Sequence, residues 1–319
     1  TGCAGFIGFH LTLFFLKNTK FKISGLDNLN NYYDQKLKYD RLKILKKNHN
    51  FKFFKIDINS KIKIKNNFSK YRYNIVIHLA AQAGVRHSIK HPENYLSSNV
   101  IGFFNILENS RKIKVKKLIY ASTSSVYGNT NKFPLKEAFD TDRPLSFYAA
   151  SKKSNEIFAY AYSNIYQLPT IGLRFFTVYG PYGRPDMALF KFTNNISKSK
   201  KIDLFNYGNH TRDFTYISDV VSAINKIISF NIGQKKIPFE IFNIASGNPK
   251  NLKTFIKQIE KNLNKKAKYN YMQLQTGDVK KTHGDIKKIK SSVNFVPRIS
   301  IDIGIAKYTI WYKEYFLKK

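Results

Sequence analysis

Hydrophobic and polar positions alternate along the chain between short apolar runs and longer segments of helical length. The apolar runs predict strands at residues 21–27, 51–58, 74–81, 115–123, 169–180 and 239–247. Segments of helical length follow Gly5 and span residues 35–47, 94–112 and 148–166, with a later one at 251–263. Strand–helix alternation at this spacing indicates an α/β fold with a doubly wound parallel sheet.

The regular alternation ends after Gly180, where loops, short strands and further helices follow. No long linker rich in Pro, Gly or Ser divides the chain, so we expect a smaller α/β region at the C-terminus that folds against the sheet. The expected division gives residues 1–178, together with about 215–246, to a cofactor-binding domain. Residues 179–214 and 247–319 would form the substrate-binding region.

The stretch TGCAGFIG places Gly2, Gly5 and Gly8 directly before an apolar helix. This pattern is typical of a dinucleotide-binding Rossmann turn, which holds a pyrophosphate at the helix N-terminus. Asp27 ends the next strand, where a carboxylate binds the adenosine ribose and favours NAD over NADP. The alternative is an ordinary Gly-rich turn and a surface Asp. Because a strand normally precedes such a turn, and the sequence begins at Thr1, we expect the first strand to be truncated.

Hydroxyl residues 122–125 end the strand predicted around Leu118. The carboxyl ends of strands are where open α/β sheets place their chemistry, although a Ser/Thr-rich turn is the alternative. Downstream, Tyr148 and Lys152 share one face of a predicted helix. A lysine ammonium beside a phenol lowers the pKa of the phenol, so Tyr148 could act as a general base. The Thr123 hydroxyl could share the proton.

The charge of the chain is strongly basic, with 55 Lys and Arg against 20 Asp and Glu. Such a surplus raises nucleic-acid or anionic-membrane binding as a hypothesis. The lysines are scattered among Asn and Ile without a basic block interleaved with aromatic residues, which favours a compositional bias and neither partner. A single cysteine, Cys3, excludes an intrachain disulfide and fits a cytoplasmic location. The histidines show no metal-ligand spacing, so we expect no metal site.

Several longer motifs resemble a known superfamily. TGCAGFIG, HLAAQAGVRHS, YASTSSVYG, YAASKKSNE, RFFTVYGP and RDFTYISDV are similar to the extended short-chain dehydrogenases/reductases, specifically the NAD-dependent nucleotide-sugar epimerases and dehydratases. DNLNNYYDQKLKYDRL, AGVRHSI and YGPYGRPDMALFKF are most similar to the UDP-glucuronate 4-epimerase branch. The resemblance covers essentially the whole chain. It implies C4 epimerisation of UDP-glucuronate to UDP-galacturonate through a transient 4-keto sugar, with tightly bound NAD, in a homodimer.

The resemblance also implies the residues of the site. The NAD-binding residues would be Gly2, Gly5, Phe6, Ile7, Gly8, Asp27, Asn28, Asp57, Ile58, Leu79, Ala80, Ala81, Asn99, Tyr148 and Lys152. The catalytic residues would be Thr123, Tyr148 and Lys152. The UDP-sugar would contact Arg86, Ser124, Ser125, Thr177, Arg184 and Arg212, with Arg212 at its diphosphate. Solvated surface arginines are the alternative for Arg86 and Arg184.

Two positions separate this chain from sister activities. Ser124 and Ser125 stand where dehydratases of this superfamily carry an Asp–Glu pair, and the strand-end motif lacks the Glu that is typical of decarboxylating relatives. A UDP-glucose/UDP-galactose 4-epimerase and a UDP-glucuronate decarboxylase remain alternatives. A non-catalytic NAD-binding fragment or scaffold is an alternative of a different class, against which the complete set of Thr123, Tyr148 and Lys152 argues.

Overall fold

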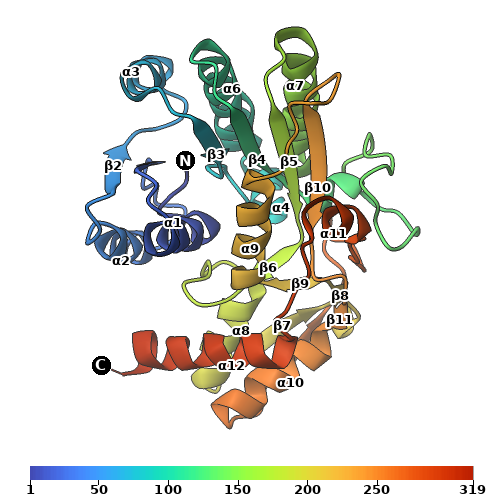
Figure 1. Ribbon diagram of the computed structural model, residues 1–319. Coiled ribbons are helices and arrows are strands. Elements are labelled where there is room, and N and C mark those ends of the chain that lie inside the picture. The colour runs from blue at the N-terminus through green and yellow to red at the C-terminus, as the bar shows by residue number, and fades with distance from the viewer. Residues whose placement is uncertain (319) are drawn as a thin grey trace.

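A computed structural model describes residues 1–318 and has the expected α/β architecture around parallel strands (Figure 1). Four parallel strands form the central sheet in the order β10–β5–β4–β3, and β1 and β2 form a separate parallel pair beside it. The bounds are β1 Ile23–Asp27, β2 Phe51–Lys55, β3 Ile75–His78, β4 Lys117–Thr123, β5 Thr170–Phe175 and β10 Phe239–Ile244. Because all these pairs are parallel, the carboxyl ends of the strands share one edge.

The first residues of the chain lie between the two groups of strands. The Thr1 amino group donates to the Ile77 carbonyl at 2.8 Å, and the Leu79 N–H donates to the Thr1 carbonyl at 3.2 Å. On the other side, the Gly2 N–H donates to the Leu26 carbonyl at 2.7 Å. The glycine turn is therefore fixed by backbone hydrogen bonds between β1 and β3.

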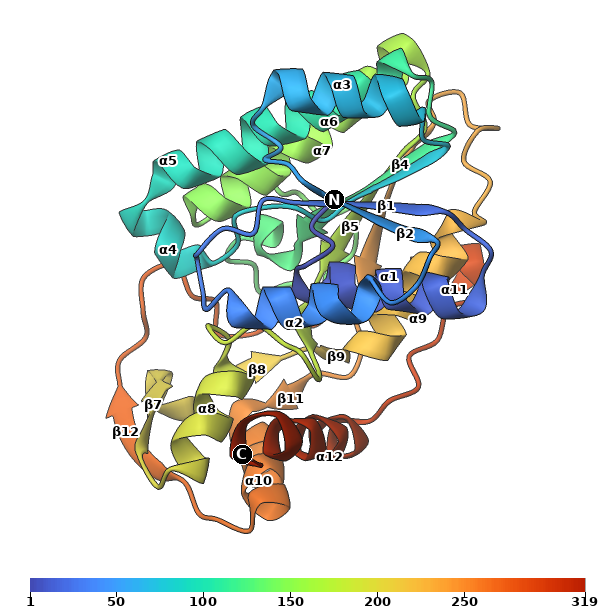
Figure 2. The same ribbon diagram turned by 90° about the vertical axis from the view of Figure 1, so that its left-hand side faces the viewer.

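Helices cover both faces of the strands (Figure 2). On one face lie α3 Lys61–Tyr71, α6 Gly102–Lys112 and α7 Phe147–Tyr166, and on the other lie α1 Phe6–Asn18, α2 Lys36–Leu45 and α9 Ile217–Ile228. The predicted helix at 94–112 begins at Pro92, with α5 Pro92–Tyr95, and includes a π-helical turn at Leu96–Ile101 before α6; the short helix α4 Val85–Lys90 precedes it, separated by the non-helical His91. No helix within residues 1–318 combines the length and apolarity that a membrane crossing requires.

The predicted single strand at 169–180 is wrong, because the chain changes sheets at Phe176. β5 stays in the central sheet, whereas β6 Thr177–Tyr179 pairs with β9 Phe214–Tyr216. The Thr177 N–H donates to the Asp213 carbonyl at 3.1 Å. The buried Asp213 carboxylate in turn accepts from the N–H groups of Ser246, Gly247 and Gly284, which holds β9 in place. The hydrogen bond to Asp213, which is distant in the sequence, therefore pairs β6 with β9 and not with the central sheet.

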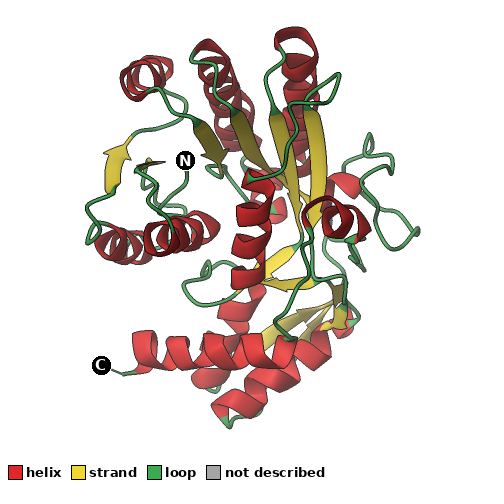
Figure 3. Ribbon diagram, viewed as in Figure 1, coloured by secondary structure: helices red, strands yellow, loops and turns green. Residues whose placement is uncertain are grey.

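Most of the remaining elements lie beyond the carboxyl edge of the sheet, whereas α11 packs beside β10 (Figure 3). They are β7 Lys201–Phe205 with β12 Lys268–Met272, β8 Thr211–Arg212 with β11 Lys250–Asn251, and the helices α8 Ala188–Ser197, α10 Leu252–Leu263, α11 Lys287–Val293 and α12 Ile301–Tyr312. One cluster of buried apolar side chains is continuous between both parts: it includes Ile171 and Leu173 of β5, Phe214, Phe255 and Tyr308. Because one apolar core is shared, β9, α10 and α12 are held against the central sheet.

Candidate active site

The glycine turn leaves no room for side chains. Gly2 has a φ of +72°, and a Cβ at this position would lie 2.7 Å from the backbone N of Ala80. A Cβ on Gly8 would lie 2.0 Å from the carbonyl O of Gly2. At Gly5, no side chain caps α1, so the N–H groups of its first turn are available to an anion. The turn therefore has the geometry of a pyrophosphate cradle.

Acidic residues lie beside this turn at the ends of β1 and β2. The Asp27 carboxylate accepts from the Ala4 N–H at 3.1 Å and from the Leu29 N–H at 2.9 Å. The Asn28 side-chain amide donates to the Asp57 carboxylate at 2.9 Å. The two strand ends are thus linked through Asn28, with Ile58 buried behind them. Carboxylates held in this way are suited to accept hydroxyl groups of a ribose.

The segment after β3, Leu79–Ala80–Ala81, lies against the same turn. The buried Asn99 side chain accepts from the Gln82 N–H at 2.8 Å and donates to the Gln82 carbonyl at 3.0 Å. It also donates to the Ser151 hydroxyl of α7 at 2.9 Å. Asn99 therefore fixes this segment against the helix that carries Tyr148 and Lys152.

Thr123, Tyr148 and Lys152 come together where β4 ends and α7 begins. The Ser146 hydroxyl caps α7 by accepting from the Ala149 N–H at 3.1 Å, so Tyr148 lies in the first turn and Lys152 one turn further on. Burial raises the pKa of Tyr148, and both the Thr123 hydroxyl and the Arg184 guanidinium oppose the rise. Burial also lowers the pKa of Lys152 to about 7. Each group is shifted towards its neutral form.

This result corrects the expectation that Lys152 lowers the pKa of Tyr148. Loss of solvation outweighs the attraction between an ammonium and a phenolate, because burial penalises both charged forms. The cation that acts on Tyr148 is Arg184, from the loop after β6, and the hydroxyl that acts on it is Thr123. The expectation that Lys152 acts on Tyr148 rested only on their spacing of four residues along one helix.

Polar atoms of α7 that point into the site are unsatisfied. Lys152 is 1% exposed and its Nζ has no hydrogen-bond partner among residues 1–318. The buried side-chain amide of Asn155 also lacks partners in this part of the chain. Buried polar atoms are rarely left unpaired, so these atoms indicate a ligand rich in hydroxyl and amide groups. Together with the glycine cradle, they fit the ribose, nicotinamide and diphosphate of NAD.

A buried ion pair holds α7 against the sheet. Arg174 of β5 donates to both carboxylate oxygens of Glu156, at 2.9 and 2.8 Å, and both side chains are 3% exposed. The Ser122 hydroxyl of β4 donates to the same carboxylate at 2.6 Å. Ser122 adjoins Thr123, and Glu156 lies one turn beyond Lys152. The pair therefore sets the position of Tyr148 and Lys152 relative to Thr123.

The predicted substrate residue Arg184 has a protein partner. Its guanidinium donates to both carboxylate oxygens of Asp186, at 3.0 and 2.5 Å, and the Tyr32 hydroxyl donates to Asp186 at 3.2 Å. Although burial acts to raise it, the pKa of Asp186 is held below its ordinary value by the Arg184 guanidinium. Arg184 is therefore no solvated surface arginine. It links the loop after β1, through Asp186 and Tyr32, to Tyr148.

Arg86 and Arg212 form a second group at the edge of the site. Arg86 pairs with Asp278 at 2.9 Å, and its guanidinium lies over the Phe205 ring at 4.5 Å. Burial lowers the pKa of Arg212, which donates to the carbonyls of Thr211 and Lys280. Asp278 and Arg86 both act on the Arg212 charge. Two guanidiniums around one carboxylate leave a net positive charge that suits a diphosphate.

The neutral candidates lie at the ends of β4 and β5, and Ser125 is linked to Tyr148 through Thr123. Ser124 and Ser125 open a 3₁₀ turn after β4, and the Ser125 N–H donates to the Thr123 hydroxyl at 3.2 Å. Thr177 begins β6 and is half-buried. Ser125, Thr123 and Tyr148 thus form a row of hydroxyl groups at the strand ends.

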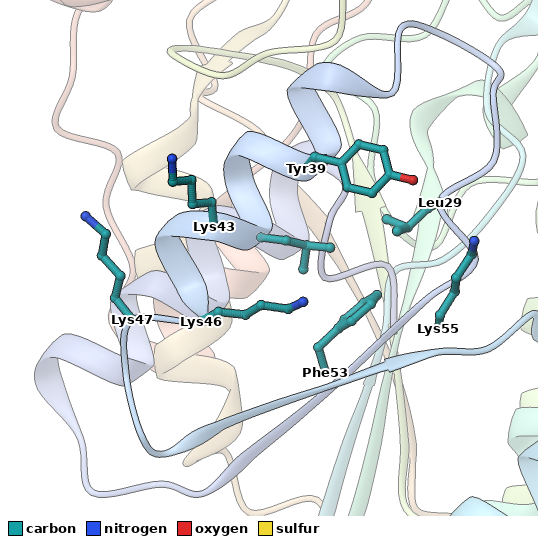
Figure 4. Close-up of a pocket in the computed structure, with 8 residues that line it drawn as sticks. Leu29, Tyr39, Lys43, Lys46, Lys47, Phe53 and Lys55 are labelled. Carbon is teal, nitrogen blue, oxygen red and sulfur yellow. The ribbon is translucent and has the colours of Figure 1, made fainter.

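Sequence reasoning missed Glu156, Arg174, Asp186 and Asp278. Glu156 in YAASKKSNE, Arg174 in RFFTVYGP and Asp186 in YGPYGRPDMALFKF each lie in a motif that also contains a named site residue, whereas Asp278 lies outside the motifs. The pairing of Arg174 with Glu156 and of Asp278 with Arg86 depends on contacts between distant segments, which no local pattern reveals. A wide groove of about 650 Å³ lies between α2 and β2, next to the end of β1, and is lined by Leu29, Tyr39, Leu42, Lys43, Lys46, Lys47, Phe53 and Lys55 (Figure 4). Within residues 1–318, no group of three or more His, Cys, Asp or Glu side chains could hold a metal.

Known proteins resemble the chain over its full length. The profile of the family described as GDP-mannose 4,6 dehydratase matches residues 1–308. A UDP-glucuronate 4-epimerase from Thermodesulfobacterium geofontis is 45% identical over 315 residues, which cover 98% of this chain and 95% of that protein.

Solved structures agree with this match. The UDP-glucuronic acid 4-epimerase from Bacillus cereus in complex with UDP-glucuronic acid and NAD superposes with a TM-score of 0.92 at 32% identity, covering 99% of this chain and 98% of that one. A UDP-glucose 4-epimerase from Thermotoga maritima with UDP-glucose gives 0.88 at 29% identity, covering 98% and 97%. This chain therefore belongs to the GDP-mannose 4,6-dehydratase family, within the extended short-chain dehydrogenase/reductase superfamily that its motifs indicated.

Proposed function

We propose that this protein is an NAD-dependent epimerase that inverts C4 of UDP-glucuronate to give UDP-galacturonate. The observation that carries the proposal is the meeting of Thr123, Tyr148 and Arg184 beside the glycine cradle, in a chain whose relatives include UDP-glucuronate 4-epimerases. Ser124 and Ser125 provide no acid–base pair for eliminating water, so the dehydratase activity in the family's description does not fit this site.

The cofactor would extend along the edge of the sheet. The N–H groups of Phe6, Ile7 and Gly8 would hold the diphosphate of NAD, and Asp27 with Asn28 would hold the adenosine ribose. Asp57 and Ile58 would flank adenine. Leu79, Ala80, Ala81 and Asn99 would line the nicotinamide half, and Lys152 would donate to its ribose hydroxyls. Bound there, NAD would supply the acceptor and then the donor of a hydride at the sugar C4.

Proton transfer falls to residues of this chain. Tyr148 would accept the proton of the sugar 4-hydroxyl, with Thr123 as the neighbouring hydroxyl that orients it. Since burial raises its pKa, Tyr148 starts as a neutral phenol and needs a nearby cation to become a phenolate. Arg184 supplies one such charge, and Lys152 supplies another once ribose hydroxyls solvate its ammonium. The resulting 4-keto sugar would turn over within the cleft before it is reduced on its other face.

The sugar nucleotide would lie between the two arginine groups. Arg86 and Arg212 would bind the diphosphate, and Ser124, Ser125, Thr177 and Arg184 would surround the C6 carboxylate. Residues 179–214 and 247–319, which supply Arg184 and Arg212, would act as the substrate-binding region, and residues 1–178 with about 215–246 as the NAD-binding domain. UDP-glucose 4-epimerisation is the nearest alternative. Ser124, Ser125 and Thr177 favour an acidic sugar, because these neutral donors can bind its carboxylate without adding negative charge.

The same proposal includes a homodimer in the cytoplasm, where NAD and nucleotide sugars occur. Large apolar side chains are exposed on the outer helices: Leu96 and Ile101 in the π-helical turn, Phe104 on α6 and Ile157 on α7. Exposed apolar groups in one region favour a protein interface. Light scattering on the purified protein should give twice the mass of the chain, and a monomer mass would refute the dimer.

The proposed base is tested by replacing Tyr148 with Phe. This change removes the proton acceptor but little packing surface, so we expect kcat for UDP-glucuronate epimerisation to fall by more than about tenfold with NAD still bound. Products are identified by NMR. The matched control is Tyr160→Phe, on the exposed side of the same helix, which should leave kcat unchanged. A Tyr148→Phe enzyme with near-parental kcat would exclude Tyr148 as the base.

The strand-end serines are tested by the pair Ser124→Ala and Ser125→Ala. A hydrogen bond to a charged group contributes roughly 1.5–3 kcal/mol, so we expect slower epimerisation. A 4-keto acid whose carboxylate is no longer held loses CO₂, and part of each turnover should end as a UDP-pentose in mass spectra. Ser291 and Ser292, an exposed pair on α11, supply the control double variant. Full-rate epimerisation without pentose in the Ser124/Ser125 variant would contradict this role.

The buried Lys152 makes stability depend on pH. Its folded-state pKa of about 7 lies below the ordinary 10.5, so the folded protein carries an unpaired buried ammonium at pH 6 and loses this cost as the pH rises through 7 towards 10.5. In NAD-free protein, Lys152→Met should therefore raise the free energy of unfolding at pH 6 by about 1–3 kcal/mol, and by less at pH 9.

Urea titrations at both pH values measure this difference, with exposed Lys63→Met on α3 as a control for the loss of a charge. With saturating NAD, the parental protein should instead be more stable than Lys152→Met, because hydroxyl groups of the bound cofactor would accept from the Lys152 ammonium. If Lys152→Met changes the free energy of unfolding equally at pH 6 and pH 9, Lys152 is not buried as a charged group.

A further inference from the structure

Arg41 of α2 is a fully buried arginine that touches three functional segments. It is 0% exposed. One terminal nitrogen donates to the Ala4 carbonyl at 2.7 Å and to the Tyr33 hydroxyl at 2.8 Å, and the other donates to the Tyr182 carbonyl at 2.6 Å. Ala4 belongs to the glycine turn, Tyr33 to the loop after β1, and Tyr182 to the loop after β6. One guanidinium therefore joins the cofactor turn to both loops of the substrate side.

The charge of Arg41 has no counterion. All three of its acceptors are neutral oxygens, its Nε has no hydrogen-bond partner, and no carboxylate forms an ion pair with it within residues 1–318. Asp27 reaches the same turn, but its oxygens accept from the N–H groups of Ala4 and Leu29. A guanidinium cannot lose its proton in a protein, so a buried one without a counterion is unfavourable unless an anion binds nearby.

Lys38 adds a second positive charge beside Arg41, and the Asp27 carboxylate offsets only one of the two. Lys38, one turn before Arg41, donates to the Asn30 carbonyl and the Asn30 side chain at 2.7 Å each. His10 of α1 contacts the Pro181 carbonyl at 2.8 Å, and burial lowers the pKa of this imidazole to about 4, so it stays neutral. The excess charge beside the glycine turn is therefore positive and is complementary to a diphosphate.

The loop after β6 depends on these contacts. Tyr182 has a φ of +54°, a left-handed conformation that a non-glycine residue rarely adopts without support. Its carbonyl is held by Arg41 and its ring packs 5.0 Å from the ring of Phe9 on α1. Two residues further on, Arg184 pairs with Asp186 and acts on Tyr148. The position of Arg184 is thus fixed from the cofactor side of the molecule.

We propose that Arg41 is a positioning residue that couples the two ligands: its charge favours the diphosphate at the glycine turn, and its three hydrogen bonds hold the Tyr33 and Tyr182 loops where the sugar nucleotide binds. The diphosphate of NAD at the turn would offset the charge of this buried guanidinium, and the guanidinium holds the loop that presents Arg184 to the second ligand. The coupling is reciprocal, so each ligand tightens the other. The identity of the second ligand as UDP-glucuronate rests on the proposed function.

Calorimetry on Tyr148→Phe protein, which should not turn over, tests the coupling. NAD and UDP-glucuronate are each titrated alone and with the other at saturation, which gives a coupling ratio of the two Kd values. We expect a ratio above 1 when Arg41 is present. Arg41→Met should weaken NAD by about tenfold or more and bring the ratio to 1. Arg41→Lys keeps the charge but cannot reach three acceptors, so it should restore most of the NAD affinity without restoring the ratio.

Phe68→Leu, a buried change on α3 far from these loops, controls for general destabilisation: it should lower the melting temperature and leave both quantities unchanged. If Arg41→Met does not fold, the test depends on Arg41→Lys alone. A coupling ratio that stays at the parental value in Arg41→Lys overturns the proposal. Parental NAD affinity and ratio in Arg41→Met would also overturn it. Failure of UDP-glucuronate to bind when Arg41 is present refutes the proposed substrate, while the NAD titrations still test Arg41.

Discussion

The buried ion pair between Glu156 and Arg174 sets the geometry on which the site depends. Tyr148 and Lys152 lie on α7, whereas Thr123 lies at the end of β4, so their separation is decided by how the helix sits along the sheet. The Glu156 carboxylate binds β5 through Arg174 and β4 through Ser122 at the same time. A shift of α7 along the sheet would separate Glu156 from Arg174 and leave an uncompensated buried charge. This displacement is therefore strongly unfavourable.

Burial gives the site its chemical character. It moves Tyr148 and Lys152 towards their neutral forms, and it leaves the Arg41 guanidinium without a counterion. These groups are poorly satisfied by the protein alone, and a ligand with diphosphate and hydroxyl groups would satisfy them. The same principle explains why the overall surplus of lysines is a weaker guide to function. Exposed charges are screened by solvent, whereas a few buried ones decide which ligand is favourable.

Local patterns predicted much of the fold and the residues of the site. The glycine turn, Asp27 and the Tyr148–Lys152 spacing are each defined within one short motif, so they could be recognised without the tertiary structure. The break at Phe176 could not be predicted, because it depends on a hydrogen bond to Asp213. The direction of the pKa shift of Tyr148 was wrong because burial, which is a property of the whole fold, outweighs a neighbouring charge.

The role of Arg41 shows the same limit. No sequence motif singled out Arg41, which is buried because α2 packs against the glycine turn and two loops. Likewise, the sequence singled out Arg184 as a candidate substrate contact, whereas its pairing with Asp186 and its action on Tyr148 emerge from the fold.

The central claim is that hydrogen leaves C4 of the sugar and returns to the same carbon without exchange with water. Turnover of UDP-glucuronate that carries deuterium at C4, in ordinary water, tests this most directly. We expect UDP-galacturonate that retains the deuterium at C4, as judged by NMR and by mass. A product with solvent hydrogen at C4 would contradict the account, because it would place the abstracted hydrogen on an exchangeable protein group.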